Sequence, residues 1–378
     1  MPETSPDRHI QPLPQPGPRP PQADKLPEAP DTDDEGKKPM PRGSRNFVPI
    51  IMSLALICVL GLTRLQAQVE LVVSLGAGYT DNVLQLSEHD LQRFDRNDSA
   101  FSYVDTSDDL QLSARLDLAY PLRYRWWKFT PSLTATVSEH VSNQEKWRRD
   151  AIIRLRTDRY YWNLTLLYGY YPHSYVRSYV DTDGSGEMEP YSYARNLYRA
   201  DLNLKPLKHA TVQLHGRWEQ HFYNQYWTEY DGTALQAGIG FRYSFPVFNL
   251  SGSYNYRSFD NSGAQDRDYS YDSNIYSGTL QIKPMPLFED KPQGPSWYPA
   301  LTLDYEQRYF QSLDDWYGGR MDRTWTTNAA CNFNLSPRWK ILLDYSHRFR
   351  NVDSPVAAVR RAREYGANRI TATAKYSF

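Results

Sequence analysis

Arginine and carboxylate side chains recur on one face of many alternating segments after residue 68. A face crowded with such groups can sort small solutes by charge and size if it lines a water-filled passage. The same groups can instead form salt bridges that brace a wall, and the sequence leaves both interpretations open. The predicted charged lining consists of Arg115, Arg154, Arg156, Arg199, Arg217, Arg242, Arg257, Arg308, Arg348 and Arg350, with Asp117, Asp201, Glu219, Asp304, Glu306 and Asp344.

A second candidate is the acidic stretch at 181–192, which resembles the opening of an EF-hand calcium loop. Asp181, Asp183 and Ser185 stand at positions 1, 3 and 5, and Glu187 stands at position 7. Ser192 stands at position 12, where a bidentate glutamate is needed. A solvated acidic turn is the alternative, and no other cofactor is predicted.

A third candidate is His347, which falls on an apolar face between Tyr345 and Phe349. The tight turn before it predicts Thr327 as its cross-strand partner. A histidine beside a hydroxyl could serve a lipid hydrolase. No nucleophilic serine lies in register with it, so the sequence favours a histidine at a membrane interface, and no catalytic residue is predicted.

The composition excludes several classes of protein. The 378 residues carry 43 basic and 44 acidic side chains, which argues against a nucleic-acid binder held by a basic surface. Two cysteines cannot build a disulfide scaffold or a thiolate zinc site. The 54 aromatic residues, counted as 10 Trp, 30 Tyr and 14 Phe, are too many for a disordered polar chain.

The first 67 residues differ from the rest, with 13 of the 26 prolines and Phe47 as their single aromatic residue. Residues 1–46 are predicted to be a disordered extension. Residues 47–67 fit the apolar region and cleavage site of a signal peptide. Translation from Met40 would make this an ordinary signal peptide and the preceding residues a mis-start. The alternative is an uncleaved anchor with a proline-rich arm.

Strict alternation of apolar and polar residues runs from residue 68 to the end and predicts β-strands. The connections between strands alternate between tight turns, several with proline, and long loops. Within the longest loop, 81–108, Ser87 is the predicted cap of a short helix, which folds inward as a plug or outward as a lid. The fourteen predicted strands are 69–80, 109–120, 127–138, 150–158, 160–170, 195–204, 210–222, 233–245, 248–259, 273–283, 298–310, 324–335, 339–350 and 365–378.

Aromatic residues gather where strands meet the turns and loops, as the two girdles of a membrane barrel would require. The last strand alternates to a terminal Phe378, with Tyr376 on the same face. This ending resembles the assembly signal of bacterial outer-membrane β-barrel proteins, a resemblance that covers roughly residues 69–378. The even number of strands, with short turns on one side, predicts both termini in the periplasm, and the resemblance implies an up-and-down transmembrane barrel in residues 68–378. It also implies lipid and the barrel-assembly machinery as partners.

A soluble β-sandwich or propeller is the alternative fold, but no repeat of fixed period supports a propeller. The sequence therefore predicts an all-β outer-membrane barrel that passes small hydrophilic solutes, with a preference for anions. One alternative function is a surface-binding or assembly barrel whose long loops engage a partner or polysaccharide. Another is a lipid-modifying enzyme.

Overall fold

The computed structural model describes residues 69–180, 186–262, 268–289, 294–312 and 316–378, so the predicted extension and signal peptide lie outside the described residues. One antiparallel sheet of 16 strands dominates it, and two of the strands, β3 (Leu122–Tyr124) and β12 (Met285–Pro286), are very short. The long strands are β1 (Glu70–Thr80), β2 (Asp109–Ala119), β4 (Trp127–His140), β5 (Arg148–Asp158), β6 (Trp162–Val180), β7 (Met188–Leu207), β8 (Ala210–Tyr223), β9 (Gly232–Ser244), β10 (Phe248–Asn261), β11 (Tyr271–Ile282), β13 (Ser296–Phe310), β14 (Met321–Asn334), β15 (Trp339–Asp353) and β16 (Tyr365–Ser377).

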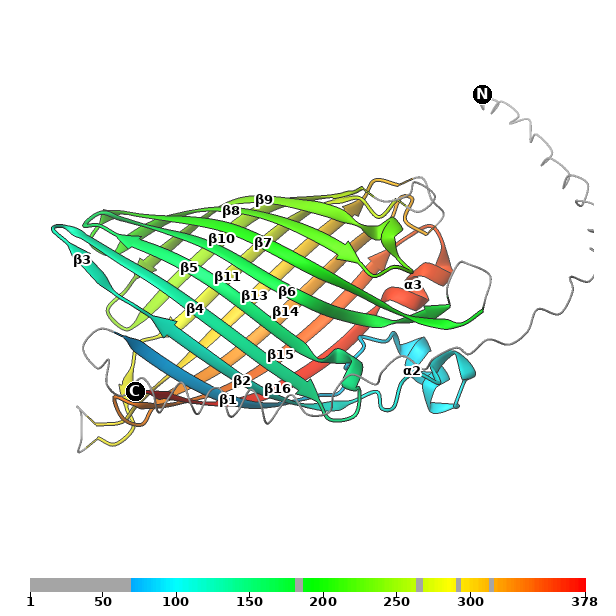
Figure 1. Ribbon diagram of the computed structural model, residues 1–378, viewed down its shortest axis with the longest axis horizontal. Coiled ribbons are helices and arrows are strands. Elements are labelled where there is room, and N and C mark those ends of the chain that lie inside the picture. The colour runs from blue at the N-terminus through cyan, green and yellow to red at the C-terminus, as the bar shows by residue number, and fades with distance from the viewer. Residues whose placement is uncertain (1–68, 181–185, 263–267, 290–293, 313–315) are drawn as a thin grey trace, which may run out of the picture. The chain divides into compact units, whose positions relative to one another are not determined.

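The fourteen long strands close into a barrel (Figure 1). Strand β1 pairs with both β2 and the last strand β16, and β11 pairs directly with β13. Closure gives each of these strands two hydrogen-bonded neighbours and removes the open edges of a sheet. The predicted strand number and the predicted fold class are confirmed. The predicted pairing of Thr327 with His347 is also observed.

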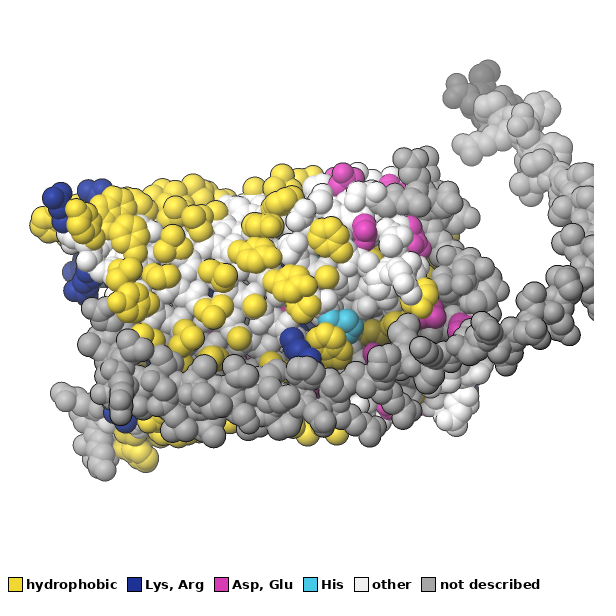
Figure 2. All heavy atoms as spheres, viewed as in Figure 1, with side chains coloured by type: hydrophobic (Ala, Val, Ile, Leu, Met, Phe, Trp, Pro, Cys, Tyr) yellow, Lys and Arg dark blue, Asp and Glu magenta, His cyan; other side chains and the backbone are white. Residues whose placement is uncertain are grey.

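The two faces of each strand differ in character, as the alternation predicts. On β8, Leu214 and Trp218 are 43% and 42% exposed on the outer face, whereas Glu219 points inward and is fully buried. Apolar side chains cover much of the visible outer wall (Figure 2). In the same view, Lys and Arg gather at the end with the short turns, and Asp and Glu lie toward the other end, called here the loop end.

One predicted loop is wrong. The predicted strands leave residues 171–194 as a long connection, but most of these residues continue β6 and β7 as a hairpin beyond the other strands (Figure 1). Register shifts fall between Tyr171 and Ser174 and between Tyr175 and Arg177. Each shift moves a side chain to the opposite face, so the alternation breaks although the strand continues.

Two helices lie at the loop end: α2 (Glu88–Asp95) and α3 (Ala357–Arg363). The predicted cap of α2 is confirmed, since Ser87 Oγ accepts a hydrogen bond of 3.0 Å from the backbone N–H of Asp90. Short 3-10 turns lie at Ser99–Phe101, Gln144–Lys146 and Thr228–Tyr230. In the described part of the chain, no helix has the length and apolar character needed to span a membrane.

Close packing of the wall can be tested at Gly238, on the inner face of β9. A Cβ there would lie 2.1 Å from Asn255 Oδ1 and 2.6 Å from the backbone oxygen of Tyr254. We therefore expect Gly238→Ala to destabilise the barrel by about 1–3 kcal/mol. The measurement is the urea midpoint of unfolding in lipid vesicles. Gly278→Ala is the control, because a Cβ at Gly278 meets nothing within 4 Å. Equal midpoints for the two variants would contradict this packing.

Candidate functional site

Many of the predicted lining charges form ion pairs along a single strand. Arg115 lies 2.7 Å from Asp117, and Arg199 lies 2.8 Å from Asp201. Arg156 pairs at 2.8 Å with Asp158, which the sequence analysis did not include. Residues two apart in a strand point to the same side, so each pair forms locally. Such pairs brace the wall and largely cancel each other's charge.

Other predicted lining residues occupy the same inner face without an ion pair to another described residue. Arg154 is opposite Ser132, and Arg242 is opposite Ser251. Asp304 and Arg348 are both cross-strand neighbours of Thr326. The fifth such residue, Asp344, is opposite Thr371.

The remaining lining residues gather toward the loop end around the carboxylate of Glu219. Its Oε2 lies 2.9 Å from Arg257 Nη2 and 3.0 Å from His221 Nε2. Arg195 lies 3.7 Å from Oε1, and Arg217 also forms an ion pair with it. One carboxylate thus faces three guanidinium groups, which leaves an excess of two positive charges. Nearby, Glu306 pairs with Arg308 at 3.0 Å, and Arg350 lies 3.9 Å from Asp322.

These charges border a cavity of about 870 Å³ at the loop end, which we call the vestibule. Its volume falls within the usual ~300–1,000 Å³ of small-molecule sites. Nine tyrosines and two tryptophans line it, and Asp322 is the one acid among its described lining residues. The seven lining arginines are Arg177, Arg195, Arg257, Arg308, Arg320, Arg350 and Arg363.

Aromatic rings hold several of these arginines in place without neutralising them. The guanidinium of Arg308 lies 4.2 Å from the ring centre of Tyr271, and that of Arg350 lies 4.9 Å from that of Tyr365. Arg363 packs similarly over Trp316 at 5.5 Å. Cation–π packing orients a cation but does not cancel its charge. The vestibule is therefore a concave, ring-lined and positively charged site.

Segment 81–108 lies at the loop end, with α2 beyond the ends of β1 and β2 (Figure 1), and we call this segment the lid. Its first residues, including Val83 and Gln85, also border a small cavity among the inner faces of the strands. Its own apolar core consists of Val83, Leu84, Leu86, Phe101 and Val104. Arg177 Nη2 donates to the carbonyls of Leu84 and Gln85 at 3.2 and 3.1 Å, and Lys146 Nζ donates to the carbonyl of Val83 at 2.8 Å. A carbonyl acceptor does not neutralise a cation, and Arg177 also lies 3.6 Å from the carboxylate of Asp90.

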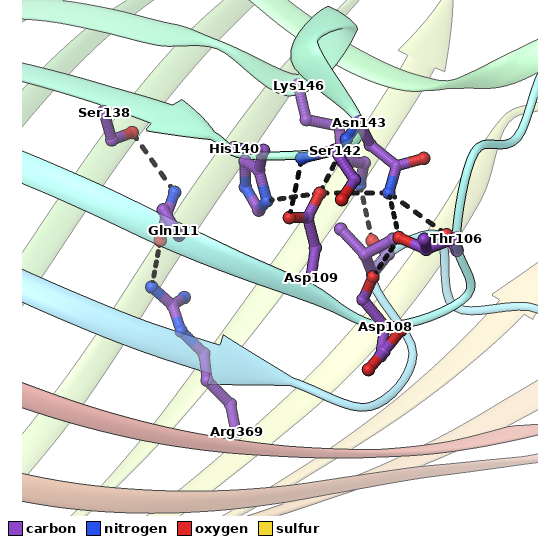
Figure 3. Close-up of polar contacts among 11 residues, drawn as sticks. Thr106, Asp108, Asp109, Gln111, Ser138, His140, Ser142, Asn143, Lys146 and Arg369 are labelled. Carbon is purple, nitrogen blue, oxygen red and sulfur yellow. Dashed lines mark hydrogen bonds and ion pairs between the residues drawn. The ribbon is translucent and has the colours of Figure 1, made fainter.

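The second end of the lid is tied to the connection between β4 and β5 (Figure 3). The carboxylate of Asp109 accepts hydrogen bonds from the backbone N–H groups of Ser142 and Asn143, at 3.1 and 2.7 Å. The side-chain amide of Asn143 donates to the carbonyl of Thr106 at 3.1 Å. The lid is therefore anchored at both ends by polar contacts that are at least partly buried.

The other sequence candidates are not brought into the vestibule. Asp181, Asp183 and Ser185 lie outside the described residues, and Glu187 directly precedes β7. Among the described residues, no three His, Cys, Asp or Glu side chains are grouped to hold a metal ion. His347 Nδ1 lies 2.8 Å from Asn368 Oδ1, so its partner is an amide rather than the acid of a catalytic triad.

The predicted assembly residues lie at the seam of the barrel. Tyr376 packs against Trp339 and Phe378, with ring centres 4.9 and 4.7 Å away. The backbone N–H of Phe378 donates to the carbonyl of Leu71 at 3.0 Å. Phe378 thus contributes to the joint between the first and last strands.

Comparison with known proteins gives fold likeness without a family. No family model and no curated protein matches the sequence. Among solved structures, an anion-selective porin from Comamonas acidovorans shares 9% identity at a TM-score of 0.41, covering 82% of this chain and 98% of that chain. The outer membrane channel DcaP of Acinetobacter baumannii shares 10% identity at 0.42, with coverages of 83% and 98%. OpdK of Pseudomonas aeruginosa, solved with vanillate, shares 6% identity at 0.40, with coverages of 82% and 99%. With scores this low, the assignment of the barrel rests on its own strand pairing.

Sequence reasoning missed much of the vestibule. Arg177, Arg320 and Arg363 lie in segments predicted as loops, as do most of the lining tyrosines. The available signal was the repeated occurrence of arginine beside tyrosine or tryptophan in these loops, for example at Tyr175 to Tyr179. Solvated loops rarely need so many rings.

The buried ammonium of Lys146 predicts a pH dependence. Burial, with a further contribution from nearby Arg177, lowers its pKa to about 8. An unfolded lysine has a pKa of ~10.4, so between these values the unfolded chain binds more protons. Stability should therefore rise with pH from about 8 to about 10.

The measurement is the thermal unfolding midpoint across that pH range. Lys146→Met should flatten the rise, whereas Lys208→Met, which removes an exposed lysine at the opposite end, should retain it. An unchanged slope in Lys146→Met would contradict the assignment to this ammonium.

Proposed function

We propose that the chain forms a bacterial outer-membrane channel that passes small hydrophilic solutes and prefers anions. The observation that carries this proposal is the surplus of arginine around the vestibule of a closed barrel. The proposal is one of transport and includes no catalytic step.

Placement in a membrane is supported by the outer wall. Exposed leucines and aromatic rings would be costly in water but are stable against hydrocarbon. Fourteen is an even number, so the chain enters and leaves the barrel at the same end. That end carries the short turns, which face the periplasm in bacterial outer-membrane barrels. We infer that both termini of the barrel are periplasmic and that the lid and vestibule face the outside.

Anion preference is supported by how the charges are distributed. Nearer the short turns, Arg115, Arg156 and Arg199 each have a carboxylate partner. Seven arginines line the vestibule, and four carboxylates lie near them. Asp322 is itself part of the lining, whereas Glu219, Glu306 and Asp90 form ion pairs with lining arginines from outside it. Seven positive charges against four negative ones leave an excess of three. Such a site raises the local concentration of anions.

Reversal potentials across a KCl gradient in planar bilayers test this proposal. We expect selectivity for chloride that becomes clearer as salt rises, because acidic groups at the loop end repel anions until they are screened. Arg308→Gln and Arg350→Gln should each reduce that selectivity. Arg338→Gln, in an exposed turn at the opposite end, is the control. Cation selectivity at all salt concentrations would overturn the proposal.

A surface-binding barrel is the second candidate, and the anchored lid favours it. A lid held by Arg177 and Lys146 covers the end through which a solute would enter. The two functions differ in conductance. A folded barrel that carries no current at any voltage would favour binding over passage.

We also propose that the last strand is read by the barrel-assembly machinery. Deleting Phe378 removes its hydrogen bond to Leu71 and its ring contact with Tyr376. The expected result is a lower amount of protein in isolated outer membranes. Deletion of Gln225, an exposed residue in the connection from β8 to β9, should have a smaller effect. Similar amounts of the two variants would remove support for this role.

A further inference from the structure

We propose that the vestibule binds acidic sugars, specifically short oligosaccharides whose rings carry carboxylates. This inference deepens the proposed function and rests on it, because it names the solute class that the site would admit. Three features carry it: arginines in excess, ring surfaces set at steep angles, and buried donors that have no partner.

The arginines supply the charge recognition. Arg257 and Arg308 are both cross-strand neighbours of Ser273, so they project side by side from the inner wall. The Nε–H groups of Arg195, Arg308, Arg350 and Arg363 are buried without a hydrogen-bond partner among the described residues. Guanidinium groups bind carboxylates through paired N–H donors. A neutral sugar would leave this excess of charge unbalanced.

The aromatic rings define the shape of the ligand. Tyr191 meets Trp227 at 72° and Tyr179 at 87°, and Tyr269 meets Tyr317 at 72°. Two other pairs, Tyr193 with His221 and Phe259 with Tyr271, are nearly parallel, but their ring centres are only 4.9 and 5.3 Å apart. Neither the crossed pairs nor these stacked pairs leave a flat slot in which a planar base or benzoate would fit between two rings. They form facets, and the C–H faces of puckered pyranose rings can pack against single aromatic facets.

Two unpartnered donors distinguish sugars from simpler anions. Trp227 and Tyr365 line the cavity and are only 3% and 6% exposed, and the donors concerned are the indole N–H of the first and the hydroxyl of the second. Neither atom has a hydrogen-bond partner among the described residues. A buried donor without an acceptor is costly, and a ligand oxygen would relieve that cost. Sugar hydroxyls and ring oxygens supply such acceptors around each ring.

Size favours an oligosaccharide over a single ion. A cavity of about 870 Å³ is far larger than phosphate needs, and its rings and donors would remain unused by that ion. Leu84 and Gln85 of the lid also line the cavity. A bound chain of a few rings would therefore contact the wall and the lid together.

Isothermal titration of the purified full-length barrel in detergent tests the inference. The probe is trigalacturonate, and maltotriose is the uncharged comparator with the same number of rings. We expect trigalacturonate to bind at least ten-fold more tightly than maltotriose, benzoate or adenosine monophosphate. Equal binding of maltotriose, or tighter binding of benzoate or the nucleotide, would overturn the proposal.

Two variants locate the site. Trp227→Phe retains a ring but removes the indole N–H, and Arg308→Gln removes one charge from the wall. Each should weaken trigalacturonate binding several-fold, and Arg338→Gln should not. The urea midpoint of each variant confirms that it is folded, and Trp227→Phe keeps the test decisive if Arg308→Gln unfolds. If either variant is folded and binds trigalacturonate as tightly as the unsubstituted protein, the proposed location of the sugar site is wrong.

Conductance separates this inference from the proposed function. Anion-selective current without trigalacturonate binding would refute the sugar site and leave the channel standing. Binding without any current would refute the channel and leave the sugar site standing. Block of the current by trigalacturonate at concentrations that saturate binding would support both.

Discussion

The pairing of β1 with β16 is the constraint on which the rest of the structure depends. A sheet surrounded by hydrocarbon cannot leave an edge unpaired, because no water is present to bond the free backbone groups. Nine residue pairs from Val72–Ser377 to Thr80–Arg369 join the two ends of the chain. With that register set, the period of two directs most apolar side chains along the middle of the strands outward and most charged ones inward.

The inner wall then divides into two chemical regions. Where the strands lie nearer the short turns, bases and acids two residues apart largely cancel each other. Toward the loop end, ion pairs such as Arg308 with Glu306 also occur, but the arginines outnumber the acids and several pack on rings, as Arg195 does on Tyr171 at 4.2 Å. The first arrangement rigidifies a wall and the second retains usable charge. This difference explains why the site lies at the loop end although charged residues occur along the whole interior.

Much of the barrel could be predicted from sequence because period-two alternation is a strong signal over long strands. The tight turns fix which residues face each other on neighbouring strands. Counting residues outward from the turn therefore predicts the pairing of Thr327 with His347. The extension of β6 and β7 could not be predicted, because its bulges disturb the alternation. Part of the vestibule was missed because it is formed by the extended strand ends and by connections such as α3, whose positions depend on contacts distant in the sequence. A lid and a plug share one helix pattern, so the sequence could not place segment 81–108, whose position depends on the distant contacts of Arg177 and Lys146.

The cation–π packing of the vestibule arginines has a consequence for how any ligand arrives. Fixed positive charge in a concave site is accompanied by mobile counterions, so the vestibule behaves as an ion exchanger. An incoming acid must displace salt anions before it reaches Arg308 and Arg350. Its apparent affinity is then set by the ionic composition of the surroundings as well as by contact geometry. The arginines would thus make ligand capture depend on the salt concentration of the solution that bathes the vestibule.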